Sequence, residues 1–238
     1  MPTTMRTMKP YTSVLASLAV AGSLVGCGDI TALDNYDAPS STLSGHVVYQ
    51  GDPVGVRNGA AQLQLWQPEY ELNTSIPVYI AQDGSFSAEL FDGSYEVNLL
   101  DGGPWVDNST RMQLEVRGDT NLELPVVPYY TVEGESITNV SDVIQAAFNI
   151  GQVNTSLGIQ RVGLYVGVTT LVDRNNNEVS VESTNVNPNA TINLSVALPN
   201  DIRLTPGPDP RTKVYARVGV QAAGKTELIY SQVYTLGL

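Results

Sequence analysis

Short runs of alternating apolar and polar residues, separated by turn residues, recur about every ten residues through much of the chain. The clearest turn signals are DGSF at residues 83–86 and DGSY at residues 92–95. Asp-Gly supplies the positive-φ geometry of a tight turn, and each aromatic residue begins a new inward-facing series. Alternation with a period of two indicates half-buried strands. The chain is therefore predicted to be all-β, and the two DGS copies are interpreted as strand boundaries rather than as a calcium site.

The first part of this pattern predicts seven strands. They are expected within residues 44–50, 60–67, 76–82, 85–91, 94–100, 111–118 and 120–130. Seven short strands with turns between them are typical of a β-sandwich. In the second strand, Leu63 and Leu65 are expected to face the core. Trp66 is then predicted on the opposite face, beside Gln62 and Gln64.

Two segments of this region resemble a known type of sandwich. SGHVVYQGDPVGVRNGAAQLQL, followed by DGSFSAELFDGSYEVNLL, is similar to the carboxypeptidase-regulatory or transthyretin-like domain. Such domains commonly begin with a Gly-x-Val strand, continue through a Pro-Val turn and carry Asp-Gly-x-Phe and Gly-x-Tyr turns. The resemblance implies a transthyretin-like sandwich over residues 44–128. It does not specify a ligand, because one fold hosts many functions.

A second sandwich is predicted over residues 129–238, after a connection that Pro125 and Pro128 restrict. Its expected strands lie within residues 146–153, 161–170, 191–198, 212–221 and 227–236. Their number and composition favour an immunoglobulin-like or fibronectin-like sandwich. The residues expected to face inward are Val162, Leu164, Val166, Val168, Val214, Ala216, Val218 and Val220. Those expected on outer faces are Arg161, Tyr165, Tyr215 and Arg217.

The amino-terminal segment has the pattern of a signal peptide. Arg6 and Lys9 precede the apolar run SVLASLAVAGSLVG, which ends at Cys27 and is short for a membrane span. The sequence Leu-Val-Gly-Cys at residues 24–27 resembles the lipobox of bacterial lipoproteins. The resemblance implies that the chain is cleaved after residue 26 and that Cys27 is acylated with fatty acids that include palmitate. The alternative is an ordinary buried cysteine. Residues 27–43 are polar and are interpreted as the lipid anchor and a flexible tether.

Charge and lipidation together define the expected partners. The signal peptide carries two of the twelve basic residues and no acidic one, so the remaining chain has ten basic and twenty-four acidic residues. Such a surface repels nucleic acid, which argues against a nucleic-acid partner. Several acyl chains on Cys27 would suffice for stable attachment to a membrane without a spanning helix.

The whole chain also resembles a two-domain lipoprotein family of unknown function from Bacteroidota. The resemblance is carried by the lipobox, LDNYDAPSSTLSGHVVYQGDPVGVRNG, GPWVDN and the late VYARVGV and IYSQVYTL. Proteins of this family are associated with polysaccharide-utilisation loci of the SusC/SusD type. The resemblance implies an outer-membrane, cell-surface lipoprotein that assists glycan uptake beside a SusC/SusD-like transporter complex. It transfers Cys27 as a functional residue and implies no catalytic residue.

The sequence offers little for catalysis. His46 is the only histidine and Cys27 the only cysteine, which argues against a nucleophilic triad and against a zinc site. The oxygen-rich run Asp173–Glu178 could suggest calcium, but it lacks the glycine and distant glutamate of a calcium loop and is interpreted as a polar hairpin turn. Paired carboxylates of a glycosidase are the enzymatic alternative. The prediction is a protein without enzymatic activity, metal or cofactor.

Aromatic residues beside polar ones give a candidate site for polysaccharide. Sugar rings stack on flat aromatic side chains while amides and carboxylates bind their hydroxyl groups. Trp66, Tyr70 and Trp105, with Asp107 and Asn108, are the candidates. Alternatively, one or both tryptophans cover a sandwich edge or the seam between the two domains. Two functions therefore stay open: an accessory protein that binds polysaccharide, and a structural or partner-docking lipoprotein with no glycan affinity of its own.

Overall fold

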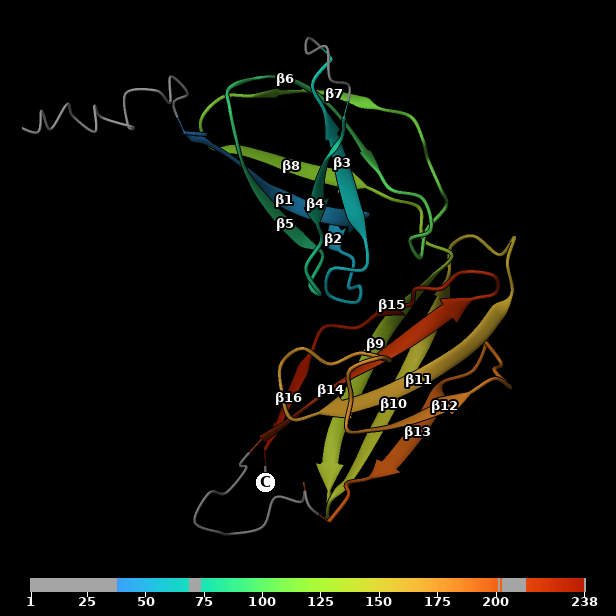
Figure 1. Ribbon diagram of the computed structural model, residues 1–238. Coiled ribbons are helices and arrows are strands. Elements are labelled where there is room, and N and C mark those ends of the chain that lie inside the picture. The colour runs from blue at the N-terminus through green and yellow to red at the C-terminus, as the bar shows by residue number, and fades with distance from the viewer. Residues whose placement is uncertain (1–37, 69–73, 201, 203–212, 238) are drawn as a thin grey trace, which may run out of the picture. The chain divides into compact units, whose positions relative to one another are not determined.

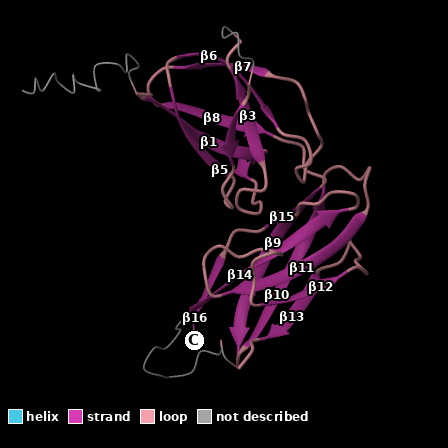
Figure 2. Cartoon of the chain, in the orientation of Figure 1, coloured by secondary structure: helices cyan, strands magenta, loops and turns pink. Residues whose placement is uncertain are grey.

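The computed structural model describes residues 38–68, 74–200, 202 and 213–237 (Figure 1). Residues from Pro39 onward belong to one compact unit. The predicted signal peptide, Cys27 and Tyr70 lie outside the described residues. Figure 2 shows strands and loops and no helix in the described part of the chain. Within that part, accordingly, no helix has the length and apolar character needed to cross a membrane.

Residues 41–125 form two sheets. The first contains β1 (Ser41–Tyr49), β2 (Asp52–Pro53), β5 (Ser85–Leu90) and β8 (Thr120–Pro125). In it β1 pairs antiparallel with β2 and β5 and parallel with β8. The second is antiparallel in the order β4-β3-β6-β7, with β3 (Gln62–Trp66), β4 (Ile76–Tyr79), β6 (Gly93–Leu99) and β7 (Met112–Val116). All seven predicted strands are present, and the two-residue β2 is additional.

Alternation along each strand builds the core of this sandwich. Leu63 and Leu65 are fully buried, and Trp66 lies on the other face of β3 and is half-buried. Tyr95 and Val97 on β6 face the same core. The predicted face assignment is therefore confirmed for these strands.

The two DGS copies are strand boundaries, as predicted. Asp83 accepts hydrogen bonds from the backbone N–H of Ser85 at 3.0 Å and from its hydroxyl at 2.7 Å, immediately before β5. Gly84 has φ +86°, and a Cβ at this position would lie 2.6 Å from the carbonyl oxygen of Val54. Asp92 precedes β6 and accepts from the Ser41 hydroxyl, which fastens the start of β1 to this turn.

Residues 130–237 form two further sheets. One has the order β13-β10-β9, with β9 (Tyr130–Val140), β10 (Val143–Gln152) and β13 (Ile192–Ala197). The other contains β11 (Ile159–Gly167), β12 (Val179–Ser183), β14 (Lys213–Ala222), β15 (Ile229–Tyr230) and β16 (Tyr234–Gly237). Both β15 and β16 pair with β14, so the predicted strand within residues 227–236 is two short strands. Strands β9 and β12 are both absent from the prediction. The sequence of β9, YTVEGESITNV, has no clear alternation.

The outward placement of Tyr165 and Arg217 predicted from the alternation is wrong, because both side chains are fully buried. Their face of the β11–β14 pair carries a second apolar cluster, which consists of Tyr165, Val172, Leu228 and Tyr230. Loop residues before β12 and before β15 therefore cover this face. A period of two assigns residues to opposite faces of a sheet but does not show whether the second face is exposed.

Arg217 is a buried cation bound by backbone carbonyls. Its Nη1 donates to the Val56 oxygen at 3.1 Å, while Nε and Nη2 donate to the Ser231 oxygen at 3.1 and 2.8 Å. The guanidinium also lies 4.3 Å from the centre of the Tyr230 ring. Burial lowers the pKa of Arg217 to about 10, so it remains charged at neutral pH. This side chain links a loop of residues 41–125 to strands of residues 130–237.

Substituting Arg217 with methionine is expected to lower the free energy of unfolding by about 2–4 kcal/mol, because two buried carbonyl groups lose their donors. Chemical denaturation followed by circular dichroism measures the change. Arg117→Met is the matched control, since the side chain of Arg117 is 82% exposed. That control is expected to change stability by less than about 0.5 kcal/mol. An Arg217→Met protein as stable as the parent would contradict the proposed role of these hydrogen bonds.

Candidate functional site

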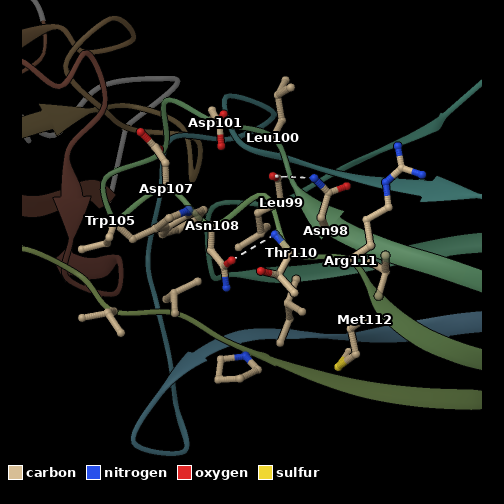
Figure 3. A pocket seen from close by; sticks show the side chains of 16 residues that line it. Asn98, Leu99, Leu100, Asp101, Trp105, Asp107, Asn108, Thr110, Arg111 and Met112 are labelled. Atoms are coloured by element: carbon tan, nitrogen blue, oxygen red, sulfur yellow. Dashed lines mark hydrogen bonds between the residues drawn. The ribbon is translucent and has the colours of Figure 1, made fainter.

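A cavity of about 600 Å³ opens at one side of the sandwich of residues 41–125 (Figure 3). It is lined by the end of β6, the loop of residues 101–110, the start of β7 and residues 124–127. Among the described strands, β7 pairs only with β6, and β8 pairs only with β1. The two sheets are therefore not joined by hydrogen bonds between β7 and β8, which leaves the core accessible here. We call this cavity the edge pocket.

The inner wall of the edge pocket is apolar. Val97, Leu124 and Val126 are buried core residues that form part of it. Around the opening lie the exposed side chains Leu100, Val106, Met112 and Val127. Eight large apolar side chains are exposed in the described part of the chain, and these four account for half of them. Exposed apolar surface gathered at one pocket marks a site of interaction.

Polar side chains form the rim, and the loop of residues 101–110 holds several of them in place. The Asn108 Oδ1 accepts from the Thr110 backbone N–H at 3.0 Å. Asp107 accepts from the Gly102 backbone N–H at 3.0 Å, and its other oxygen pairs with Lys225 Nζ at 2.8 Å. In Figure 3, Asp107 and Asn108 follow Trp105 along this loop, and Thr110 leads into β7. Local hydrogen bonds thus fix the rim.

The charges at the rim are mostly neutralised by neighbours. The Gly102 N–H and the Lys225 ammonium lower the pKa of Asp107, which keeps this carboxyl group ionised. Arg111 forms an ion pair with Glu96 at 3.1 Å. Its guanidinium carbon also lies 3.8 Å from the centre of the Trp66 ring. Asp101, by contrast, has no ion pair with a described residue.

The prediction that Trp105 is a solvent-facing platform is wrong, because its side chain is only 2% exposed. Residue 105 forms a β-bridge with Pro128, and Val106 donates to the Val127 oxygen at 2.9 Å. This short pairing turns the indole into the core, where it forms part of the inner wall of the pocket. Gly103 permits the packing, since a Cβ there would lie 2.5 Å from the Trp105 ring.

Trp66 is on the predicted face but does not offer a free ring. Arg111 covers one side of the indole, and its Nε1 donates to Asn98 Oδ1 at 3.1 Å. Trp66 does not line the edge pocket, although both of its partners do. The structure therefore brings Trp105, Asp107 and Asn108 to one pocket and leaves Trp66 beside it.

Several lining residues were missed by the sequence reasoning, namely Asn98, Leu100, Asp101, Val106, Thr110, Met112 and Val127. A signal for two of them was available. The apolar pairs 99–100 and 126–127 break the alternation, so one member of each pair cannot face the core. In the structure Leu100 and Val127 are the exposed members.

The described residues also bear on metal binding. They contain no group of three or more histidine, cysteine, aspartate or glutamate residues placed to hold a metal. In the run Asp173–Glu178, Asp173 Oδ1 accepts from the backbone N–H groups of Asn175 at 2.7 Å and Asn176 at 3.0 Å. This run precedes β12 and is the polar turn that the sequence predicted.

Two family models match this two-part organisation. The N-terminal domain of DUF3823, a protein family of unknown function, matches residues 41–127. DUF3823_C, a domain of unknown function, matches residues 130–235. The chain belongs to the DUF3823 family. This confirms the prediction of a two-domain family of unknown function, and no match was found among curated proteins.

Solved structures of DUF3823 proteins share the fold. A protein from Parabacteroides merdae is 37% identical over 84% of this chain and all of its own, with a TM-score of 0.76. One from Bacteroides ovatus is 34% identical over 83% of this chain and 99% of its own, with the same TM-score. Another solved structure with this fold, from Bacteroides uniformis, is described as a "putative carbohydrate binding protein". It is 18% identical over 84% of this chain and all of its own, with a TM-score of 0.68, so this likeness concerns the fold alone.

Proposed function

We propose that this DUF3823 protein is a lipid-anchored accessory protein of the outer membrane, without enzymatic activity, that binds polysaccharide at the cell surface through the edge pocket. The observation that carries the proposal is a cavity of about 600 Å³ with an apolar inner wall and a polar rim. Pockets for small ligands commonly measure about 300–1,000 Å³ and combine these two kinds of surface. A sugar ring has an apolar face and a periphery of hydroxyl groups, which match the apolar inner wall and the polar rim of the pocket.

Three rim groups are available for hydroxyl groups of a sugar. The Asn108 Nδ2, the Thr110 hydroxyl and the Asp101 carboxylate line the pocket, and their residues are exposed. None of these three groups donates to or accepts from another described residue. A ligand could therefore bind them without breaking existing hydrogen bonds of the loop.

The location and the partners are proposed from the sequence. The lipobox-like residues 24–27 support acylation of Cys27 and hence attachment to a membrane. A place beside a SusC/SusD-like transporter complex would bring bound polysaccharide to an uptake channel. No such partner is required for the pocket itself to bind a glycan.

Binding can be tested with protein that begins at residue 28, which retains the whole compact unit Pro39–Leu238. Affinity electrophoresis and calorimetry against a panel of polysaccharides would identify a ligand. The double substitution of Asn108 and Thr110 with alanine is expected to weaken binding about 10-fold to 100-fold, because it removes two hydrogen bonds.

A matched control removes another amide and hydroxyl pair. Gln145 and Ser195 are exposed and face each other across β10 and β13, remote from the edge pocket in sequence and absent from its lining. Their double substitution with alanine is expected to leave binding unchanged. Failure of every polysaccharide to bind, or binding insensitive to the Asn108 and Thr110 substitutions, would overturn the proposal.

The alternative function is docking of a protein partner, and the exposed Leu100, Val106, Met112 and Val127 favour it. In that case the edge pocket would receive apolar side chains of the partner rather than a sugar. Cross-linking to a SusC/SusD-like complex in intact membranes, through a photoreactive group attached to the thiol of a Val127→Cys protein, would support docking. Polysaccharide binding that depends on Asn108 and Thr110 would count against it.

A further inference from the structure

The composition of the edge pocket restricts the class of sugar that it can accept. This step rests on the proposed function, since it assumes that the pocket binds a glycan. Two properties of the lining bear on the choice: the sign of the charges at the rim and the kind of apolar groups on the wall.

The rim offers no unpaired cation to an acidic sugar. Arg111 is the only basic residue in the lining, and it is paired with Glu96 and stacked on Trp66. Lys225, which approaches the rim through its ion pair, is bound to Asp107. The acidic residues of the lining are Asp101 and Asp107. A uronate or a sulfated sugar would therefore meet the Asp101 carboxylate, which has no ion pair with a described residue, and would find no free cation at the rim. Such like-charge contacts oppose binding.

The apolar wall consists of aliphatic groups rather than an open aromatic ring. Trp105 is almost fully buried, so its ring does not offer a surface on which a sugar could stack. The other apolar residues of the lining are all aliphatic, namely Val97, Leu99, Leu100, Val106, Met112, Leu124, Pro125, Val126 and Val127. Aliphatic walls discriminate by filling space, and one additional methyl or methylene group in such a pocket is worth about 10-fold to 200-fold in selectivity. A sugar without a methyl group would leave part of this wall in contact with water.

We propose that the edge pocket selects uncharged sugars that carry a methyl group, either as an N-acetyl substituent or as the methyl of a 6-deoxy sugar. The methyl group lies against Leu99, Leu124 and Val127, and the ring hydroxyl groups bind Asn108, Thr110 and Asp101. Acidic sugars are rejected by Asp101.

Calorimetry with matched oligosaccharides tests the proposal, again with protein that begins at residue 28. Chitotetraose and cellotetraose have the same linkage and differ by their N-acetyl groups, while L-fucose and L-galactose differ by the 6-hydroxyl. In each pair the sugar with the additional methyl group is expected to bind about 10-fold more tightly. Oligogalacturonate is expected to bind most weakly, and Asp101→Asn is expected to strengthen its binding.

Two valine substitutions test whether the preference for sugars with a methyl group arises in the edge pocket. Val127 and Val140 are each 51% exposed, but only Val127 lines the pocket. Val127→Ser is expected to remove most of the difference between chitotetraose and cellotetraose, whereas Val140→Ser retains it. Equal affinity within both sugar pairs, or tightest binding of oligogalacturonate, would overturn this proposal while leaving glycan binding intact. Absence of binding to any carbohydrate would instead overturn the proposed function.

Discussion

Trp105→Ala is expected to lower the free energy of unfolding by about 3–5 kcal/mol, which is the usual cost of removing a large aromatic side chain from a core. The indole is 2% exposed and belongs to the main apolar cluster of the described residues. Its removal would leave a void that connects with the edge pocket. Urea denaturation monitored by circular dichroism would measure the loss, and any glycan binding at the pocket should fall with it.

Trp66→Ala provides the comparison for this substitution. Trp66 is half-buried, on the outer face of β3, and packs mainly against Arg111. Removal of its side chain exposes less of the core. Trp66→Ala is therefore expected to lower the free energy of unfolding clearly less than Trp105→Ala does. Equal losses for the two substitutions would show that Trp105 does not have the core role that its burial indicates. Trp105→Phe, which keeps an aromatic ring in the same space, should recover part of the stability.

Cys27→Ser is expected to abolish attachment to the membrane. A serine at this position offers no thiol for acylation, so the lipid anchor predicted from the lipobox-like residues 24–27 cannot form. Fractionation of cells grown with labelled palmitate would show the parent protein labelled and in the outer membrane. The Cys27→Ser protein should carry no label and should not sediment with membranes.

Gly26→Ala controls for damage to the signal segment, since alanine retains a small residue before Cys27. This protein should remain labelled and anchored. Protease treatment of intact cells would then test surface exposure, because only a chain outside the outer membrane is cut without lysis. Membrane retention of unlabelled Cys27→Ser protein would contradict the lipid anchor.

Much of the fold follows from the alternation of residues, and the exceptions have physical causes. Leu63, Leu65 and Trp66 were placed correctly because one face of β3 packs in the core and the other meets solvent. Tyr165 and Arg217 were misplaced because one face of their sheet packs in the main core and loop residues cover the other face, so both faces are buried near them. Burial of a face depends on distant segments, and a local period contains no information about those segments.

The candidate site was harder to predict because it lies largely in a loop. Asp107 and Asn108 were identified from their proximity to Trp105 in sequence, and they do line the edge pocket. The orientation of Trp105 depends on its pairing with Pro128, 23 residues later, which no local pattern indicates. Sequence composition could therefore locate the loop but could not show which of its side chains face solvent.

The absence of hydrogen bonds between β7 and β8 has a consequence for the protein at high concentration. Unpaired strand edges are templates on which neighbouring molecules can add strands and aggregate. Here β8 ends at Pro125, which has no N–H group to donate, and Glu123 is exposed on the same strand. On β7, Glu115 is exposed and Arg117 follows the strand. These residues discourage edge-to-edge association, so the sandwich can keep an open side for a ligand without polymerising through it.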